Sequence, residues 1–181
     1  MVKRWARLLC VTSLLLLPLP ARAEAPAVPY LASEALANPA LVTAWLRKNA
    51  PIADKRNAAL MHDYGVKEAR RKAWSSAAKG LGDSAVLFPS PRTLDAYADA
   101  QVHFMGALRD ARGRGAQSRE RDLRTFEGLY RAALASDDVL SVLSAQERRQ
   151  IEAKAQCIAN YLRRQVGAGS CAPLKNYGIK R

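Results

Sequence analysis

The sequence predicts an all-α fold, an irregular antiparallel bundle of about five to seven helices. Apolar residues recur at helical spacing along most of the chain, and no segment shows the sustained alternation of a half-buried strand. Short connections between the helical segments favour antiparallel neighbours. The chain has 181 residues, 49% of them hydrophobic and 25% charged, which suits one folded domain of ordinary size.

The N-terminus has the features of a secretory signal peptide, and we expect cleavage after residue 23. Basic residues precede a leucine-rich run at residues 8–19, and Ala21 and Ala23 then form an A-x-A cleavage site. The run is shorter than the roughly 20 residues that span a bilayer, so we expect no transmembrane anchor after cleavage. Cleavage removes four basic and no acidic residues, which lowers the net charge from +13 to +9. The expected location is periplasmic or secreted.

Three further regions follow the signal peptide. We expect residues 24–37 to be a flexible N-terminal segment, residues 38–171 to be a single helical domain, and residues 172–181 to be a C-terminal tail. The boundary at residue 38 rests on the first clear helix start in the chain.

Capping residues and glycines place the first three helices. Asn38 followed by Pro39 is a helix start, because the asparagine side chain can cap and proline suits the first helical position. A second start follows at Pro51, and we expect that helix to stop at Gly65. A third helix is expected over residues 66–79, ending at the glycines that come next.

A loop at residues 83–90 is expected to expose the apolar side chains of Leu87 and Phe88. The serine before Pro91 repeats the cap-plus-proline signal and opens the longest helix so far. Its apolar stripe continues until the glycines that begin at Gly113 end the helix.

The second half of the chain contains two helices with a short turn between them. Ser118 opens the first, and residues 136–143 are expected to form a separate helical turn. Ser144 and Glu147 have the spacing of a capping box that starts the last helix. Its apolar stripe follows i, i+4, i+7, i+11 and i+15 at Ile151, Ala155, Ile158, Leu162 and Val166.

The mature chain keeps two cysteines, Cys157 and Cys171, and we expect them to form a disulfide. A helix from Cys157 to Val166 rises about 13–14 Å. The five following residues, if extended, reach back about 16–18 Å, so the chain can double back and tie the tail to the helix. In the chain-entropy model a loop of this size contributes about 3 kcal/mol to stability.

The chain lacks the residue patterns of metal, haem and phosphate-binding sites. The two histidines and two cysteines of the mature chain are scattered, and no metal-binding, haem or phosphate-loop motif is present. We therefore expect no metal site and no cofactor.

No catalytic residue can be assigned with a motif, but two constellations are candidates. His62 and Asp63 are adjacent in one helix, where neighbouring side chains point about 100° apart. Asp95 and Asp99 are four residues apart near a helix N-terminus and form the one candidate pair of carboxylates. For both pairs, a structural role is the competing interpretation. In that interpretation the helix dipole stabilises Asp95 near the helix N-terminus, and Asp99 is its solvated neighbour.

The basic excess is concentrated in arginines, and the segment at residues 112–119 has three of them and no acidic residue. Arg112, Arg114 and Arg119, with Leu87 and Phe88, are therefore the candidate binding residues, because arginine and exposed aromatic side chains are frequent in interfaces. Much of the remaining basic charge alternates with acidic residues, as on solvated helices. We expect no nucleic-acid partner, because nucleic acid is an unlikely partner outside the cytoplasm. In addition, no aromatic residues lie between the basic ones to stack on bases.

Three functions remain open. The leading one is a small helical binding protein, an inhibitor or immunity-type protein that binds another envelope-acting protein. The second is a secreted hydrolase of lipid or cell wall that uses His62 with Asp63, or Asp95 with Asp99. The third is an envelope assembly factor that binds an anionic polymer through its basic clusters.

Overall fold

The computed structural model describes residues 28–112, 116–164 and 171–179, and within them it confirms the all-α prediction. These residues contain seven α-helices, one 3-10 helix, one disulfide and no strand. In chain order the elements are η1 (Ser33–Ala35), α1 (Pro39–Asn49), α2 (Lys55–Arg70), α3 (Trp74–Leu87), α4 (Pro91–Arg112), α5 (Ala116–Leu140), α6 (Ala145–Leu162) and α7 (Ala172–Asn176).

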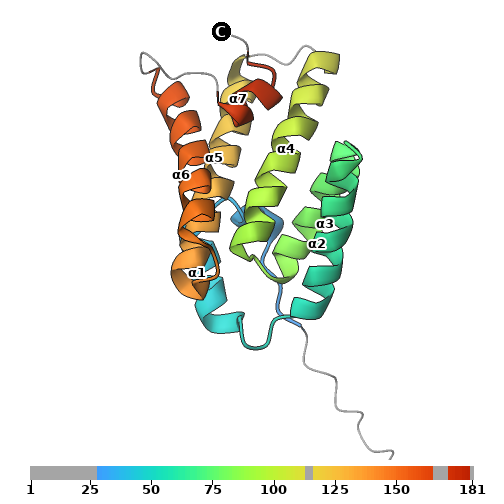
Figure 1. The fold of residues 1–181 in the computed structure, drawn as a ribbon, viewed down its shortest axis with the longest axis vertical. Helices are drawn as coiled ribbons and strands as arrows, with labels where there is room; N and C mark the ends of the chain where they lie inside the picture. Colours follow the sequence, from blue (N-terminus) through green and yellow to red (C-terminus); the bar gives the residue numbers. More distant parts are fainter. Residues whose placement is uncertain (1–27, 113–115, 165–170, 180–181) are drawn as a thin grey trace, which may run out of the picture.

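The long helices form an antiparallel series in which each packs against its neighbour in sequence (Figure 1). The α2–α3 hairpin lies against α4, α4 lies against α5, and α5 lies against α6. The first helix, α1, packs on α5, and the short α7 contacts α4 and α6 near the end of the bundle (Figure 1). The series therefore ends at α2 on one side and at α6 on the other.

The core is centred on α5, which packs against three other helices. Its inner face buries Phe126 and Tyr130, which meet Leu94 of α4 and Ile158 of α6 in one hydrophobic cluster. Leu46 brings α1 into the same cluster. A smaller cluster of short side chains joins α3 to α4.

The predicted helix stop at Gly65 is wrong, because α2 continues through it to Arg70. Gly65 is buried against Leu81 of α3, and a Cβ atom at Gly65 would lie 2.6 Å from Leu81 Cγ. Gly80 of α3 likewise lies close to α2, because a Cβ atom at Gly80 would lie 2.6 Å from a ring carbon of Tyr64. These glycines allow two helices to approach closely and do not end either of them.

The predicted helix at residues 66–79 and the predicted loop at residues 83–90 are also wrong. The turn lies earlier, where Lys72 takes a left-handed conformation with a φ of 60° after α2 ends. The α3 helix then runs to Leu87, so only three residues connect it to α4.

The helix starts are predicted more accurately than the helix ends. The side chain of Asn38 accepts hydrogen bonds from two backbone amides at the start of α1, as expected. The capping box of Ser144 and Glu147 is present at the start of α6. The second helix begins later than Pro51, at Lys55, because Asp54 caps it by accepting from Asn57 N at 3.0 Å.

The α5 helix runs through residues 136–140, where the sequence predicts a separate turn. Ser136 is completely buried, and its hydroxyl donates to the carbonyl of Pro89 at 2.7 Å. Asp137 accepts hydrogen bonds from the backbone amides of Val142 and Leu143, so its carboxylate satisfies the chain after the helix end. Ser136 and Asp137 are polar residues that favour a turn in the local sequence, but here they make hydrogen bonds to other parts of the chain.

Both segments that flank the expected domain contribute buried side chains. Leu31 and Leu36 join the main cluster, and Leu31 N donates to the carbonyl of Val86 at 2.8 Å. At the other end, Tyr177 is fully buried and its hydroxyl donates to Asp122 at 2.7 Å. The packed part of the chain therefore extends beyond residues 38–171 on both sides.

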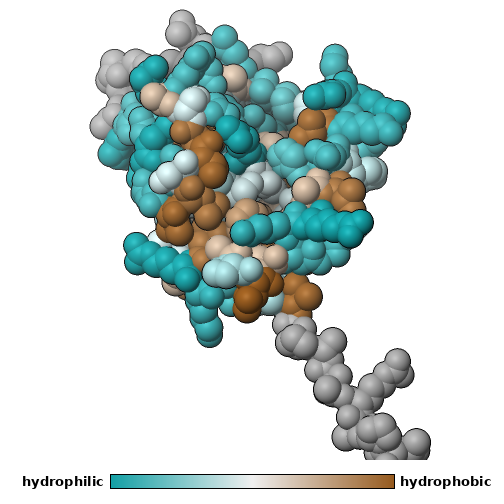
Figure 2. Space-filling view, turned by 60° about the horizontal axis from the view of Figure 1, so that its bottom comes forward, coloured by the Kyte–Doolittle hydropathy of each residue, from teal (hydrophilic) through white to brown (hydrophobic). Residues whose placement is uncertain are grey.

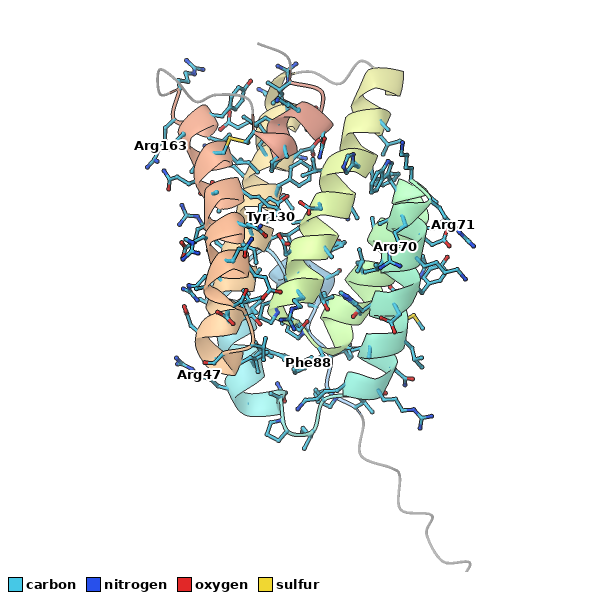
Figure 3. The ribbon with its side chains drawn as sticks, viewed as in Figure 1. Arg47, Arg70, Arg71, Phe88, Tyr130 and Arg163 are labelled. Carbon is cyan, nitrogen blue, oxygen red and sulfur yellow. A yellow bond between two sulfur atoms is a disulfide. The ribbon has the colours of Figure 1, made fainter. Side chains whose placement is uncertain are left out.

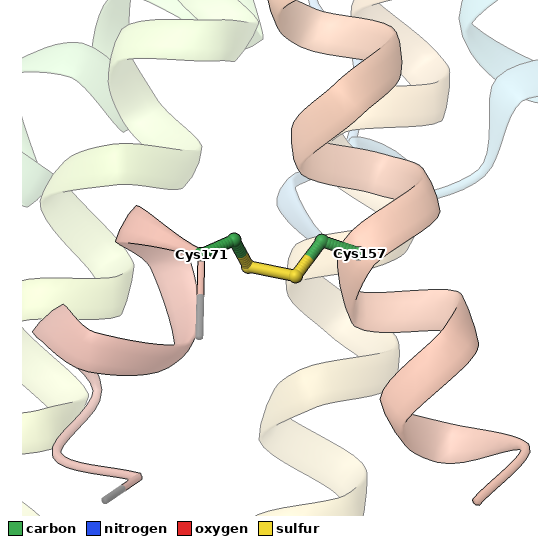
Figure 4. Close-up of a disulfide and its surroundings, with 2 residues drawn as sticks. All are labelled: Cys157 and Cys171. Carbon is green, nitrogen blue, oxygen red and sulfur yellow. A yellow bond between two sulfur atoms is a disulfide. The ribbon is translucent and has the colours of Figure 1, made fainter. Parts of the chain in front are cut away.

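The expected disulfide is present between Cys157 and Cys171 (Figure 4). It joins the middle of α6 to the residue that precedes α7, with the two Cα atoms 6.4 Å apart. The predicted reversal of the chain after Val166 lies outside the described residues. The bond thus fixes α7 beside α6 while Tyr177 anchors it to α5.

Candidate functional site

His62 lies in a small cleft between α2 and the N-terminal end of α4. The cleft has a volume of about 300 Å³. Its lining includes side chains of both charges and one aromatic ring: Lys55, Ala58, Ala59, His62, Asp63, Phe88, Ser90, Arg92 and Thr93.

A chain of hydrogen bonds leads from the start of α4 to His62. The Ser90 hydroxyl donates to Thr93 Oγ1 at 2.8 Å, and Thr93 Oγ1 is 3.1 Å from His62 Nδ1. Because Ser90 donates to Thr93, the Thr93 hydroxyl can donate to His62 Nδ1, which fits a neutral imidazole. Burial lowers the pKa of His62 and outweighs the opposing effect of Asp63, in agreement with that form.

The contacts of this cleft serve the start of α4. Ser90 Oγ also accepts from the backbone amide of Thr93, which is the arrangement of a helix cap. Within the described residues, no hydrogen bond joins His62 to Asp63, whose side chain is exposed. Both residues of this catalytic candidate therefore line the cleft, but only His62 is held there by a side-chain hydrogen bond.

The second catalytic candidate, Asp95 with Asp99, is held by a lysine that the sequence did not single out. Lys154 of α6 donates to both carboxylates at 2.8 Å, across the gap between α4 and α6. The Tyr130 hydroxyl donates to Asp99 at 2.6 Å, and the Lys154 ammonium lies 5.3 Å from the centre of the Tyr130 ring. Figure 3 shows Tyr130 in the interior between these helices.

The surroundings of this cluster raise the pKa values of Asp95 and Lys154. Burial raises the pKa of Asp95, the negative charge of Asp99 adds to the rise, and Lys154 opposes it. Burial disfavours the ammonium of Lys154, but the attraction of Asp99 and Asp95 outweighs it and raises the pKa of Lys154. The side chain of Asp99 is 45% exposed, as expected, but it also bonds to Lys154, so both carboxylates link α4 to α6. The contacts favour a structural role for the pair.

The predicted binding residues do not form one surface. Arg119 is half-buried near the start of α5, and its Nε has no hydrogen-bond partner among the described residues. Arg114 and the side chain of Arg112 lie outside the described part of the chain. Leu87 and Phe88 lie at the other end of α4, a helix of 22 residues that is about 33 Å long.

Leu87 and Phe88 are also less exposed than expected. Leu87 is the last residue of α3 and is half-buried, and Phe88 packs against the main hydrophobic cluster. The Lys55 ammonium lies 5.3 Å from the centre of the Phe88 ring, which it partly covers. The prediction of an exposed apolar loop at this place is therefore wrong.

The arginines are spread over the molecule. In Figure 3, Arg70 and Arg71 lie on the side of α2 and α3, whereas Arg47 and Arg163 lie on the opposite side. Other basic residues pair with acids along single helices, for example Arg131 with Glu127 at 2.8 Å. The positive charge is therefore not gathered on a single face.

An exposed apolar group on α2 is the feature that the sequence analysis missed. The side chains of Leu60, Met61 and Tyr64 are 57%, 38% and 48% exposed. Ala58 and Gly65 of the same helix are buried against α3, and Tyr64 lies at the border of that contact, against Gly80. Part of the exposed residues on this helix and at its C-terminal end, with the exposed acid Asp63 among them, is called the α2 surface: Arg56, Leu60, Met61, Tyr64, Lys67, Arg70 and Arg71.

Exposed apolar groups elsewhere are smaller. Figure 2 shows the end of the molecule with the α1–α2 connection, where hydrophilic residues cover much of the face and hydrophobic ones gather in separate groups. Ile52 in that connection is 68% exposed, and Leu41 on α1 is 49% exposed. In the described residues, α2 is the only helix with three exposed large apolar side chains.

The described residues contain no group of three histidine, cysteine or acidic side chains placed to hold a metal ion. None of their helices is long and apolar enough to cross a membrane.

Comparisons with protein-family models, with curated proteins and with solved structures found no match to this chain. Its function is therefore argued from its own residues and contacts.

Proposed function

We propose that this chain is a small periplasmic or secreted binding protein that acts on another protein of the cell envelope, as an inhibitor or immunity-type protein. The observation that carries the proposal is the α2 surface, on which Leu60, Met61 and Tyr64 are exposed side by side. Exposed apolar residues grouped together and rimmed by charge are typical of protein contacts.

The rigidity of α2 supports this proposal. Tyr64 lies against Gly80, and Ser84 of α3 donates to the carbonyl of Ala58 at 2.7 Å, so α3 holds the helix in place. A preformed surface loses less conformational entropy on binding than a flexible one. The exposed side chains are therefore presented by a fixed support.

The location is part of the proposal. The expected signal peptide at residues 1–23 lies outside the described residues. The disulfide of Cys157 and Cys171 supports an oxidising compartment, because such bonds persist outside the cytosol. An envelope partner follows from that compartment.

The polymer-binding alternative keeps one observation in its favour, the basic residues at the C-terminal end of α2. Lys67, Arg70 and Lys72 are exposed and make no ion pair among the described residues. Binding to a polyanion through them should weaken steeply as salt rises. Contacts centred on Leu60 and Tyr64 should persist at moderate salt.

Retention of a partner from the periplasm tests the proposal. The chain from residue 24 onward is immobilised, and periplasmic extract of the producing organism is passed over it at 50 mM and 200 mM salt. We expect one protein to be retained in stoichiometric amount at both salt concentrations, and an equimolar amount of this chain to inhibit that protein's activity on cell wall or membrane. Retention of no protein at either salt concentration contradicts the proposal.

A further inference from the structure

The α2 helix is an edge of the helical series. It packs against α3 along its length and touches α4 only slightly, and no other described helix covers its outer side. Figure 1 shows the α2–α3 hairpin at one side of the bundle. An additional helix could therefore lie along α2 without displacing any part of the described fold.

The residues of the α2 surface follow helical spacing along this edge. Arg56, Leu60, Tyr64, Lys67 and Arg71 stand at i, i+4, i+8, i+11 and i+15, which places them on one side of the helix. The apolar residues occupy the middle, and the basic residues occupy both ends. This is the anatomy of a contact with an apolar centre and a charged rim.

The charge of this edge is strongly one-sided. Residues 55–72 contain six basic and two acidic residues, a net charge of +4. Among the described residues, Arg56, Lys67, Arg70 and Lys72 make no ion pair, whereas Arg71 pairs with Glu68 at 3.2 Å. Four cations are thus available to a partner of opposite charge.

We infer that the α2 surface docks an acidic amphipathic helix of the partner protein. That helix would lay its apolar side over Leu60, Met61 and Tyr64 and place carboxylates opposite the basic ends of α2. Packing of side-chain rows between two helices needs no change in either backbone. This inference rests on the proposed function and names the chemistry of the partner.

Two other occupants fit the surface less well. A second copy would bring one α2 against another, so that two segments 55–72, each of net charge +4, would repel each other. A helix that lies on a membrane needs apolar residues along its length, but in α2 they occupy only the middle, beside the exposed acid Asp63. Charge and pattern together favour an acidic protein helix.

Photocrosslinking at two matched positions tests the inference. A benzophenone amino acid replaces Leu60 in one full-length variant and Leu41, an exposed leucine on α1, in the other. Both variants are made in the producing organism and irradiated. We expect a partner adduct at position 60 and none at position 41, and we expect the crosslinked peptide of the partner to be an acidic amphipathic helix.

Affinity measurements with the purified partner then test the two parts of the surface. Leu60→Glu should weaken binding more than tenfold, and the double variant Lys67→Glu/Arg70→Glu should do the same at 50 mM salt, with a smaller loss at 200 mM. Leu41→Glu and Arg149→Glu, on exposed residues of α1 and α6, should change affinity less than twofold. All five substituted residues are exposed, and circular dichroism checks that each of the four variants folds.

The remaining outcomes separate the inference from the proposed function. A retained partner that binds Leu60→Glu as tightly as wild type overturns the α2 inference and leaves the proposed function standing. No retained partner at all overturns both. If wild type binds phosphatidylglycerol vesicles and Leu60→Glu does not, the surface is a membrane contact. If wild type forms a dimer in analytical ultracentrifugation and Leu60→Glu does not, the surface binds a second copy. Either result overturns the inference.

Discussion

Gly65 shows how a single residue carries two meanings in a sequence. Glycine after a helical stripe indicates a helix end, but it equally permits two helices to approach closely. The local sequence around Gly65 does not distinguish these cases, because the deciding contact is with Leu81 of the next helix.

Replacement of Gly65 by alanine tests that contact. Alanine favours a helix over glycine by about 1 kcal/mol. Its Cβ would lie 2.6 Å from Leu81 Cγ and 2.9 Å from Leu81 N, so overpacking should outweigh propensity and lower the free energy of unfolding by about 1–3 kcal/mol. Urea denaturation measures this difference. A gain in stability would mean that the two helices do not meet here.

Glu147 should make stability depend on pH in the acid range. Hydrogen bonds from Arg92 and Ser144 lower the pKa of Glu147 from 4.5 to about 2. Because the folded-state pKa is depressed, this carboxylate stabilises the fold above about pH 4.5, and its contribution is lost as pH falls towards 2. Between pH 5 and pH 2.5, Glu147→Gln should therefore lose less thermal stability than wild type. Equal losses in the two proteins would contradict this assignment.

At the scale of elements, helix starts are more predictable than helix ends. Asn38 and Ser144 cap through contacts within three residues, so the sequence alone reveals them. The ends of α2, α5 and α6 are followed by left-handed residues that are not glycine, namely Lys72, Ser141 and Arg164. Such ends lack the usual glycine signal.

The end of α5 provides a test of this point. Ser141 has a φ of 51°, a conformation that disfavours residues with a Cβ atom. Ser141→Gly should therefore raise the free energy of unfolding by about 0.5–1 kcal/mol, whereas Ser141→Ala should not raise it. Thermal unfolding of the three proteins gives the comparison. An equal gain for alanine would show that removal of the hydroxyl, and not the backbone conformation, is responsible.

The candidate site was harder to predict than the fold, for a related reason. A helical stripe in the sequence shows that α2 is amphipathic, but the apolar Leu60 and Tyr64 lie on its exposed side. The inner side is built from small residues such as Ala58 and Gly65, which leave room for α3. Identification of the exposed face therefore required the packing of the two helices.

At the scale of the whole molecule, polar contacts join α4 to α6. Arg92 pairs with Glu147 at 2.9 Å, and Lys154 bridges Asp95 and Asp99. The disulfide and the bond between Tyr177 and Asp122 fix the C-terminal segment nearby. Of these long-range links, only the disulfide could be predicted, because two cysteines leave one pairing.

Lys154→Met tests how much the bridge contributes. The variant leaves Asp95 and Asp99 without their shared cation, so we expect a loss of about 2 kcal/mol at pH 7, less than for a fully buried pair because the cluster is partly exposed. The pKa of Asp95 is already raised in the folded protein. Ionisation of this carboxyl therefore destabilises the fold as the pH rises above the ordinary pKa of an aspartate. The loss should therefore be smaller at pH 4 than at pH 7. Lys48→Met, on exposed α1, is the control and should change stability little; a larger loss at pH 4 would contradict the bridge.

The central claim is that an edge helix, α2, presents the binding surface of this protein. Photocrosslinking from position 60, with position 41 as the matched control, tests it most directly. We expect a single partner adduct from position 60 and none from position 41. Adducts from position 41 alone, or equal adducts from both positions, would contradict the claim.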